Sequence, residues 1–432
     1  MMNEKLDIES NQIPLETKEY STLEKLLLPI AILIGILFDQ LMFSPVFLGS
    51  GNISIFSGIF WLCYLVMFYL FYWKRLVCNR VLWYVAGCSA LLCIWQFIFT
   101  DNSINQEFRN LTYLVIPAVL MAHAQFIHGN YQLKDTRKIV IGWIRGWFIK
   151  PFSGISSLLG VVDSLVSGGN KSNIKKAILG IVITLPLLCV IIPLLSGADQ
   201  VFGYYFKQII GKFYFGSLIM HIIVIVFALA LFYSFIWNVG FGIKEKSEQR
   251  PILQIDSLIC YIVIGSVMLL YILFCIVQFT YLFAGTGLPN AMTYSEYARE
   301  GFVQTVTVCA INLFLYGIFF QYGSKNKIIS GLLAGLLGLT GVMLFSGFIR
   351  LKLYIDAYGL TWLRVISAWF VIYLAIVIII CGIRMLREEL PAIALCALIL
   401  LGWYVILGYL NPDALIQRYN QNYNYDIEIS VE

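Results

Sequence analysis

Long apolar runs separated by short polar breaks dominate this chain. A bilayer core of about 30 Å needs roughly 20 mostly apolar residues per helix, so each such run is a candidate transmembrane helix. The predicted spans are 26–43, 53–72, 80–99, 109–128, 174–195, 213–237, 255–283, 301–322, 328–349, 362–383 and 391–409. The pattern predicts an all-α fold, a polytopic transmembrane helix bundle of about eleven spans.

The polar breaks divide the chain into five regions. Residues 1–25 are expected to form a cytoplasmic polar tail, 26–128 to hold four transmembrane helices, 174–410 to hold seven more, and 411–432 to form an external C-terminal tail. Region 129–173 alternates apolar residues with cations, and we expect a cytoplasmic interfacial amphipathic segment that Pro151 breaks in two. A tight pair of short re-entrant segments is the alternative.

Composition and charge support a membrane protein and predict its orientation. Hydrophobic residues make up 60% of the 432 residues and charged residues 12%, against roughly 25% charged in soluble domains. Under the predicted spans, 21 of the 29 lysines and arginines fall on the side of the N-terminus and 8 on the other. Because cytoplasmic loops carry the excess of cations, we expect the N-terminus inside and the C-terminus outside.

Motifs for cofactor, metal or nucleotide chemistry are not found in the sequence. It contains no P-loop, no H-E-x-x-H, no G-x-S-x-G and no G-x-G-x-x-G opening a helix. The three histidines are not grouped, and the 10 cysteines lie mostly inside apolar runs without C-x-x-C spacing. We therefore predict no metal site, no cofactor and no nucleic-acid partner, and the sequence leaves enzyme activity undecided.

Small and polar residues inside the predicted spans suggest how the helices pack. Glycines recur at three- and four-residue spacing along the ninth span, which predicts a close helix-packing face, at Gly331, Gly335, Gly338 and Gly341. Isolated polar residues are expected to form interhelical hydrogen bonds rather than an ion path, at Gln96, His123, Gln125, His221, Gln278 and Asn312.

Four polar, aromatic stretches fall on the predicted outer face. They are "PLLSGADQVF" (193–202), "TYSEYAREGF" (293–302), "RLKLYIDAYGLTWLR" (350–364) and "NPDALIQRYN" (411–420). If the third is helical, Arg350, Tyr354 and Tyr358 share one face, and Gly359 ends the helix. Arg364 then lies about one turn inside the tenth span and needs a partner. The candidate partners are Asp199, Glu296, Glu300, Asp356 and Asp413.

Two interpretations of these charges remain open. They form structural ion pairs, such as Glu296 with Arg299 or Asp356 with Arg364, beside an ordinary aromatic belt. Alternatively, they form an outward-facing pocket in which arginines and tyrosines hold a phosphate or carboxylate, with the buried Asp39 of the first span beneath it. The candidate ligand-binding residues are Asp39, Asp199, Tyr294, Glu296, Arg299, Arg350, Tyr354, Tyr358, Arg364 and Asp413.

The same four stretches resemble the signature segments of a bacterial family of polytopic membrane proteins known as domain of unknown function 4173, with a close relative numbered 4153. The resemblance covers roughly 185–420, and the first four spans match only as generic hydrophobic helices. This resemblance implies a multi-pass protein of the bacterial inner or plasma membrane. The family has no established activity, so the resemblance assigns no role to any residue.

Three functions are compatible with these features. The first is a transporter-like or ligand-responsive protein whose outer cluster binds an anionic or amphipathic, lipid-like molecule. The second is an envelope enzyme acting on a lipid-linked substrate at the outer leaflet, with Asp199 or Glu296 as base. The third is an accessory subunit that docks another membrane protein. In each case the expected surroundings are the lipid bilayer.

Overall fold

The computed structural model describes most of the chain. The described residues are 20–47, 53–77, 79–99, 105–128, 133, 136–165, 214–242, 254–278, 294–324 and 326–422, with 180, 184, 191, 194–195, 197–199 and 201–205. Only the backbone is described at 46–47, 137, 165, 214–219, 277–278 and 294–301. Statements about structure below concern these residues.

The described residues are helical and form no strand, which confirms the predicted polytopic all-α class. Nine helices in this part of the chain are long and apolar enough to cross a membrane. The predicted span 109–128 is the shorter helix α5 (Gln106–His123), which is not one of the nine. The predicted span 174–195 lies almost entirely outside the described residues, so the count of eleven and the orientation stay predictions.

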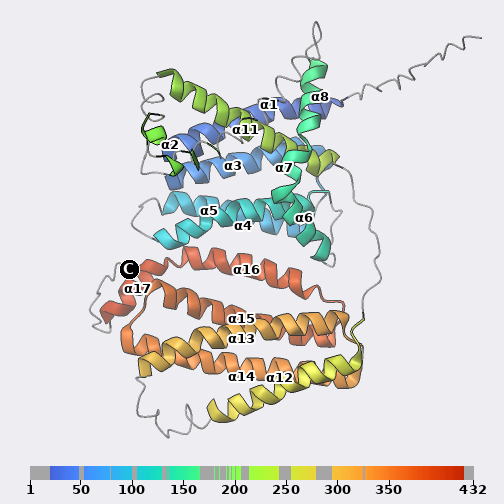
Figure 1. The fold of residues 1–432 in the computed structure, drawn as a ribbon, viewed down its shortest axis with the longest axis vertical. Coiled ribbons are helices and arrows are strands. Elements are labelled where there is room, and N and C mark those ends of the chain that lie inside the picture. The colour runs from blue at the N-terminus through green and yellow to red at the C-terminus, as the bar shows by residue number, and fades with distance from the viewer. Residues whose placement is uncertain are drawn as a thin grey trace, which may run out of the picture. The chain divides into compact units, whose positions relative to one another are not determined.

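The chain divides into two compact units, and the first comprises residues 1–40 and 148–242. Helix α1 (Thr22–Phe38) packs along α11 (Tyr214–Phe241), and α7 (Lys150–Ser153) and α8 (Ile155–Leu165) pack against α11 (Figure 1). Helix α1 begins with a capping box in which Ser21 and Glu24 satisfy each other's backbone N–H groups. It ends in a π-helical turn that begins at Asp39.

Helices α1 and α11 come unusually close at Gly35. A Cβ atom placed on Gly35 would lie 2.7 Å from the carbonyl oxygen of Ile225 and 3.3 Å from the backbone nitrogen of Leu229. Any larger residue would force the two backbones apart. Gly35 is therefore needed for this approach, as small residues are at other close helix crossings.

The second unit comprises residues 41–147 and 243–432. Its helices are α3 (Ile53–Tyr72), α4 (Arg80–Ile98), α5, α6 (Thr136–Phe148), α12 (Ser257–Gln278), α13 (Tyr294–Tyr322), α14 (Lys327–Tyr358), α15 (Trp362–Leu386), α16 (Ala392–Tyr409) and α17 (Pro412–Asn422). Helix α14 contacts α12, α13 and α15, and α16 contacts α4 and α15 (Figure 1). Trp369 and Trp403 join α15 to α16, because each indole N–H donates to the other's backbone carbonyl.

The predicted glycine face of α14 is wrong for most of its length. Of the four glycines, only Gly335 lies close to another helix, because a Cβ atom added there would contact the Met268 side chain of α12. At Gly331, Gly338 and Gly341 an added Cβ would find no described atom within 4 Å. The buried side of α14 is instead made of larger residues, which include Leu333, Leu336, Leu337, Thr340, Met343 and Leu344. Sequence spacing identified the glycines but not the side of the helix that faces its neighbours.

The predicted amphipathic segment forms three short helices, α6, α7 and α8, rather than two. The first interruption falls at Ile149, and Pro151 occupies the first turn of α7, where a missing N–H costs nothing. The second interruption is at Gly154. The expected break at Pro151 is thus misplaced, and the position of these helices at a membrane surface stays a prediction. The expected C-terminal tail also begins as a helix, α17.

Candidate functional site

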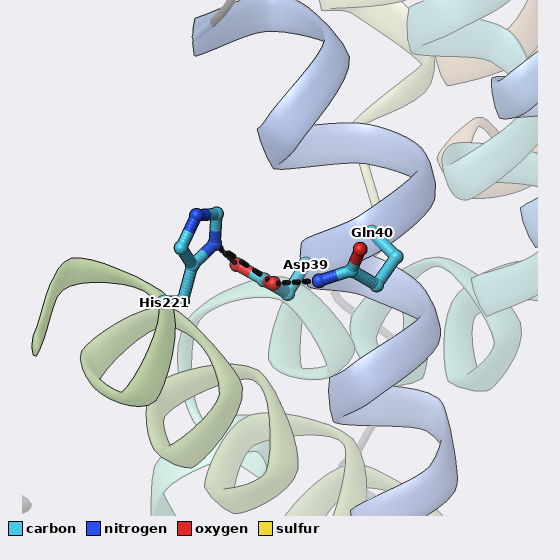
Figure 2. Close-up of polar contacts among 3 residues, drawn as sticks. All are labelled: Asp39, Gln40 and His221. Carbon is cyan, nitrogen blue, oxygen red and sulfur yellow. Dashed lines mark hydrogen bonds and ion pairs between the residues drawn. The ribbon is translucent and has the colours of Figure 1, made fainter. Parts of the chain in front are cut away.

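A buried carboxylate lies between the two long helices of the first unit. The Asp39 side chain is 0% exposed, and both of its oxygens approach His221 Nδ1, at 2.8 and 2.9 Å (Figure 2). The Gln40 side-chain amide donates to the second Asp39 oxygen at 2.7 Å. Among the described residues, these are the partners of Asp39. The carboxylate is therefore paired with an imidazole across the contact between α1 and α11.

The sequence indicated both halves of this pair but not their contact. An intramembrane carboxylate is a functional hypothesis by default, and the expected interhelical hydrogen bond of His221 is confirmed. The sequence did indicate that both residues lie at a similar depth in the membrane. Asp39 and His221 are each a short distance inside the predicted outer end of their spans. The π-helical turn at Asp39 was not foreseen, and such turns often occur at functional sites.

In the second unit, the stretch 350–364 forms the end of α14 and the start of α15. Helix α14 continues without a break to Tyr358, past the predicted span end at 349, and Gly359 ends it with a φ of 73°. Tyr354 and Tyr358 lie on one face with ring centroids 5.4 Å apart, as the spacing predicted. Arg350 is buried within the protein, where it is 5% exposed.

Arg364 is held by backbone carbonyls and aromatic rings. One terminal nitrogen, Nη1, donates to the carbonyl oxygens of Tyr358 and Gly359 at 2.8 and 2.6 Å. The guanidinium carbon lies 4.1 Å from the centre of the Tyr354 ring. Arg364 forms no ion pair with the candidate partners Asp356 and Asp413, and the side chains of two other candidates, Glu296 and Glu300, lie outside the described residues. Within the second unit, no described carboxylate neutralises Arg364.

Helix α17 brings a second predicted stretch to this turn. The Asn420 side chain accepts a hydrogen bond from the Leu360 N–H at 2.7 Å and donates one to the Leu360 carbonyl at 2.9 Å. The stretches 350–364 and 411–420, which are far apart in the sequence, are therefore in contact. This clamp holds the turn directly after the carbonyls that bind Arg364.

Asp413 and Asp199 each accept hydrogen bonds from backbone N–H groups of their own unit. Asp413 accepts a hydrogen bond from the backbone N–H of Asn105, and its own N–H donates to the Asn105 side chain, which joins α17 to the start of α5. Asp199 accepts hydrogen bonds from the N–H groups of Val201 and Phe202 at 2.8 and 3.3 Å and caps a short helical segment. The side chains of Tyr294, Glu296 and Arg299 lie outside the described residues.

A groove of about 480 Å³ opens along one side of α17. It is lined by Leu410, Asn411, Ala414, Leu415, Arg418, Tyr419 and Asn422. Arg418 is exposed, and among the described residues none forms a hydrogen bond or ion pair with its guanidinium group. The candidate residues chosen from the sequence omitted Arg418, although it lies within the stretch 411–420. The described residues contain no cluster of three or more side chains suited to hold a metal ion.

Comparison with known proteins identifies a family. The family model described as Domain of unknown function (DUF4153) matches residues 86–428. The match begins within α4, well before the resemblance expected over 185–420, so part of the N-terminal helices also carries the family pattern. No curated protein and no solved structure matches the chain.

Proposed function

The chain belongs to the DUF4153 family of multi-pass membrane proteins, and from that premise we propose that it is a transporter-like or ligand-responsive protein that binds an anionic, amphipathic molecule. The observation that carries the proposal is a pair of cations in the second unit. Arg364 and Arg418 lie on the two segments that the Asn420 clamp joins, and no described carboxylate of that unit neutralises either one.

The immobilisation of Arg364 supports a binding role. Its ring contact and its two carbonyl contacts fix the guanidinium group, which leaves Nε and Nη2 without a partner among the described residues. A guanidinium group presents a planar set of donors that matches phosphate and carboxylate oxygens. Because the Arg364 side chain is already restricted in conformation, it loses little further entropy when an anion binds.

The groove along α17 supports an amphipathic ligand rather than a small inorganic anion. Leu410 and Leu415 give it apolar walls, and Arg418 supplies the charge. Helix α17 directly follows α16, one of the helices long enough to span a membrane, which supports a groove at a membrane boundary. The excess of cations at the opposite loops supports an outward-facing site.

The envelope-enzyme alternative receives less support. It required Asp199 or Glu296 as a base, and Asp199 instead caps a local helical segment. No contact of the described residues favours the accessory-subunit alternative.

The test uses the full-length protein in nanodiscs and two probes with the same tail, dodecyl phosphate and the uncharged dodecyl maltoside. Dodecyl phosphate at one hundred times its dissociation constant should stabilise the protein by about 2.7 kcal/mol, measured as a rise in the unfolding temperature. Arg364→Gln combined with Arg418→Gln should abolish this rise. Arg364→Lys should retain part of it, because a point charge remains without the planar donors.

Lys352→Gln is the matched control, since Lys352 is an exposed cation on the same end of α14 that takes no part in the clamp. This variant should respond to dodecyl phosphate as the unaltered chain does. Equal stabilisation by dodecyl maltoside, or a full response in the double arginine variant, would show the proposal to be wrong. Flux of labelled dodecyl phosphate into proteoliposomes then separates a transporter from a ligand-responsive protein.

A further inference from the structure

Asn411 is the corner residue between α16 and α17, and it serves both helices at once. It lies in the left-handed region at a φ of 51°, directly after Leu410, the residue that ends α16. Its backbone N–H donates to the Gly408 carbonyl at 3.1 Å, and its side-chain Oδ1 accepts a hydrogen bond from the Ala414 N–H at 3.4 Å. Asparagine suits this position because it tolerates the left-handed conformation and can also cap a helix.

A second left-handed asparagine, Asn105 at the start of α5, holds this corner. Asn105 has a φ of 52° and is 1% exposed. Its backbone N–H donates to the Asp413 side chain, its Oδ1 accepts from the Asp413 N–H at 3.2 Å, and its Nδ2 donates to Asn411 Oδ1 at 2.9 Å. We call these three residues the asparagine joint. Its hydrogen bonds offset the cost of two left-handed residues in contact.

The backbone fixes which way both side-chain amides of the joint point. The N–H of Asp413 can only donate, so the Asn105 atom that it meets is the oxygen, and Asn105 turns its NH2 group toward Asn411. The Ala414 N–H identifies the oxygen of Asn411 in the same way. Because an amide carries its oxygen and nitrogen on different sides of one carbon, Asn411 Nδ2 is directed away from Asn105.

Asn411 also lines the groove of the proposed anion site. Leu415, Arg418 and Asn422 follow it at helical spacing, so one face of α17 forms a wall of this groove. Side chains on a helix lean toward its N-terminus, which directs the Arg418 guanidinium group toward Asn411. A charged donor and a neutral amide donor therefore lie along the same face.

We propose that Asn411 Nδ2 donates a hydrogen bond to an oxygen of the bound anionic headgroup, and that Asn105 is a positioning residue that orients this amide for the ligand. The inference rests on the anion site proposed above and adds a second recognition element to it. Arg418 recognises the charge of the headgroup and Asn411 an acceptor oxygen, and phosphate and carboxylate groups provide both. An amide that is already oriented loses little side-chain entropy when the ligand binds.

The test measures the dissociation constant of dodecyl phosphate for the full-length protein in nanodiscs, by calorimetry. Asn105→Gly removes the side chain that orients Asn411, while glycine adopts the left-handed conformation without steric cost. We expect the dissociation constant to rise about tenfold, which corresponds to the loss of one oriented hydrogen bond.

Asn326→Gly is the matched control. Asn326 precedes another helix, α14, and its side chain accepts a hydrogen bond from the Ile328 N–H and donates one to the Tyr261 hydroxyl. It lies at the start of this 32-residue helix, about 48 Å from the turn that α17 contacts. This variant should lose stability with its missing cap and leave the dissociation constant unchanged.

Further variants separate a role in binding from a role in folding. Asn411→Asp keeps Oδ1, and with it the joint and the helix cap, but replaces the donor by a charged acceptor, so the dissociation constant should rise by more than about tenfold. Gln417→Glu places the same charge on a part of α17 that does not line the groove and should change the constant by less than about twofold. Once Asn411→Gly has removed the amide, adding Asn105→Gly should weaken binding no further, because Asn105 acts through Asn411.

The outcomes distinguish this inference from the proposed function. If the unaltered chain does not discriminate dodecyl phosphate from dodecyl maltoside, the anion site is wrong and the inference is wrong with it. If the unaltered chain and the arginine variants behave as proposed, but Asn105→Gly or Asn411→Asp binds dodecyl phosphate as tightly as the unaltered chain, only the inference is wrong. If Asn105→Gly fails to fold, Asn411→Asp decides by the same comparison.

Discussion

The two units hold their buried or membrane-boundary charges in opposite ways. In the first unit, Asp39 is fully enclosed and faces an imidazole, that of His221, on another helix. In the second unit, Arg364 is half-exposed and held by backbone carbonyls and a tyrosine ring. The first arrangement encloses a carboxylate and supplies its hydrogen-bond partners from within the unit. The second fixes a charge in place and leaves it without a counter-charge among the described residues of its unit.

This difference indicates which kind of ligand each cluster can accept. A fully buried carboxylate that already accepts hydrogen bonds from an imidazole and an amide is closed to an outside ligand. A cation anchored by dipoles and a ring keeps its full charge, and among the described residues of its unit no carboxylate neutralises it, so an anionic ligand can. The comparison therefore favours the second cluster as the site of the proposed anion.

The largest effect should come from breaking the pair in the first unit. His221→Ala leaves the Asp39 carboxylate buried without its imidazole, and we expect a loss of roughly 3–5 kcal/mol in the free energy of unfolding. Reversible unfolding in detergent measures this loss. Asp39→Leu combined with His221→Leu should recover most of it, because an apolar pair avoids the buried charge. A double variant as unstable as His221→Ala would contradict the assignment of a charged pair.

An intermediate effect is expected at the clamp in the second unit. Asn420→Ala removes both hydrogen bonds to Leu360 from a buried position, which should cost about 1–3 kcal/mol of stability. Hydrogen exchange at the Leu360 amide is the direct measurement, and it should become faster. Asn420→Asp keeps the acceptor and loses the donor, so it should protect this amide better than alanine does. Unchanged exchange in Asn420→Ala would show that the clamp does not hold the turn.

The smallest effect lies in the first unit, at the opposite end of α1 from Asp39. Tyr20 packs against Gly160 of α8, and burial, followed by the nearby charges of Glu24 and Asp163, raises the pKa of its phenol. Above about pH 10 an unfolded tyrosine ionises while the folded one stays neutral, so this group lowers stability as pH rises. Tyr20→Phe should make the unfolding temperature fall less steeply above pH 10.

The control for this experiment is Tyr204→Phe, since Tyr204 is 65% exposed. That substitution should leave the slope of the unfolding temperature against pH unchanged. The same alkaline slope in Tyr20→Phe and in the unaltered chain would contradict the prediction. Because only protonation of the phenol is involved, the effect should vanish below pH 9.

Local features of the site were predictable from the sequence, and contacts between distant residues were not. The end of α14 at Gly359 and the shared face of Tyr354 and Tyr358 follow from helical spacing and the conformational freedom of glycine. The Asp39–His221 contact joins residues 182 positions apart, and spacing within a span says nothing about such a pair. Likewise, a sequence identifies carboxylates that could pair with Arg364. It cannot indicate which backbone carbonyls bind the guanidinium group, because every residue carries a carbonyl.

The errors have a physical reason as well. The glycines of α14 follow a spacing that permits close packing, but a helix packs with whichever face its neighbours cover, and here larger residues occupy that face. Pro151 was expected to interrupt a helix, although the first turn of a helix accommodates proline without loss. A correct prediction would have required knowing which face of α14 its neighbours cover and at which residue α7 begins.

The π-helical turn that starts at Asp39 has a consequence for the chain's length. A π turn holds about one residue more than an α turn, so residues 39–43 contain the equivalent of a single inserted amino acid. Removing one residue after Asp39 would restore an ordinary helix and leave the residues that follow close to their present orientation, because the π turn absorbs the extra residue. Related chains that lack this turn should therefore align with a one-residue gap here, and the presence or absence of that residue would mark which of them can hold the carboxylate in its place.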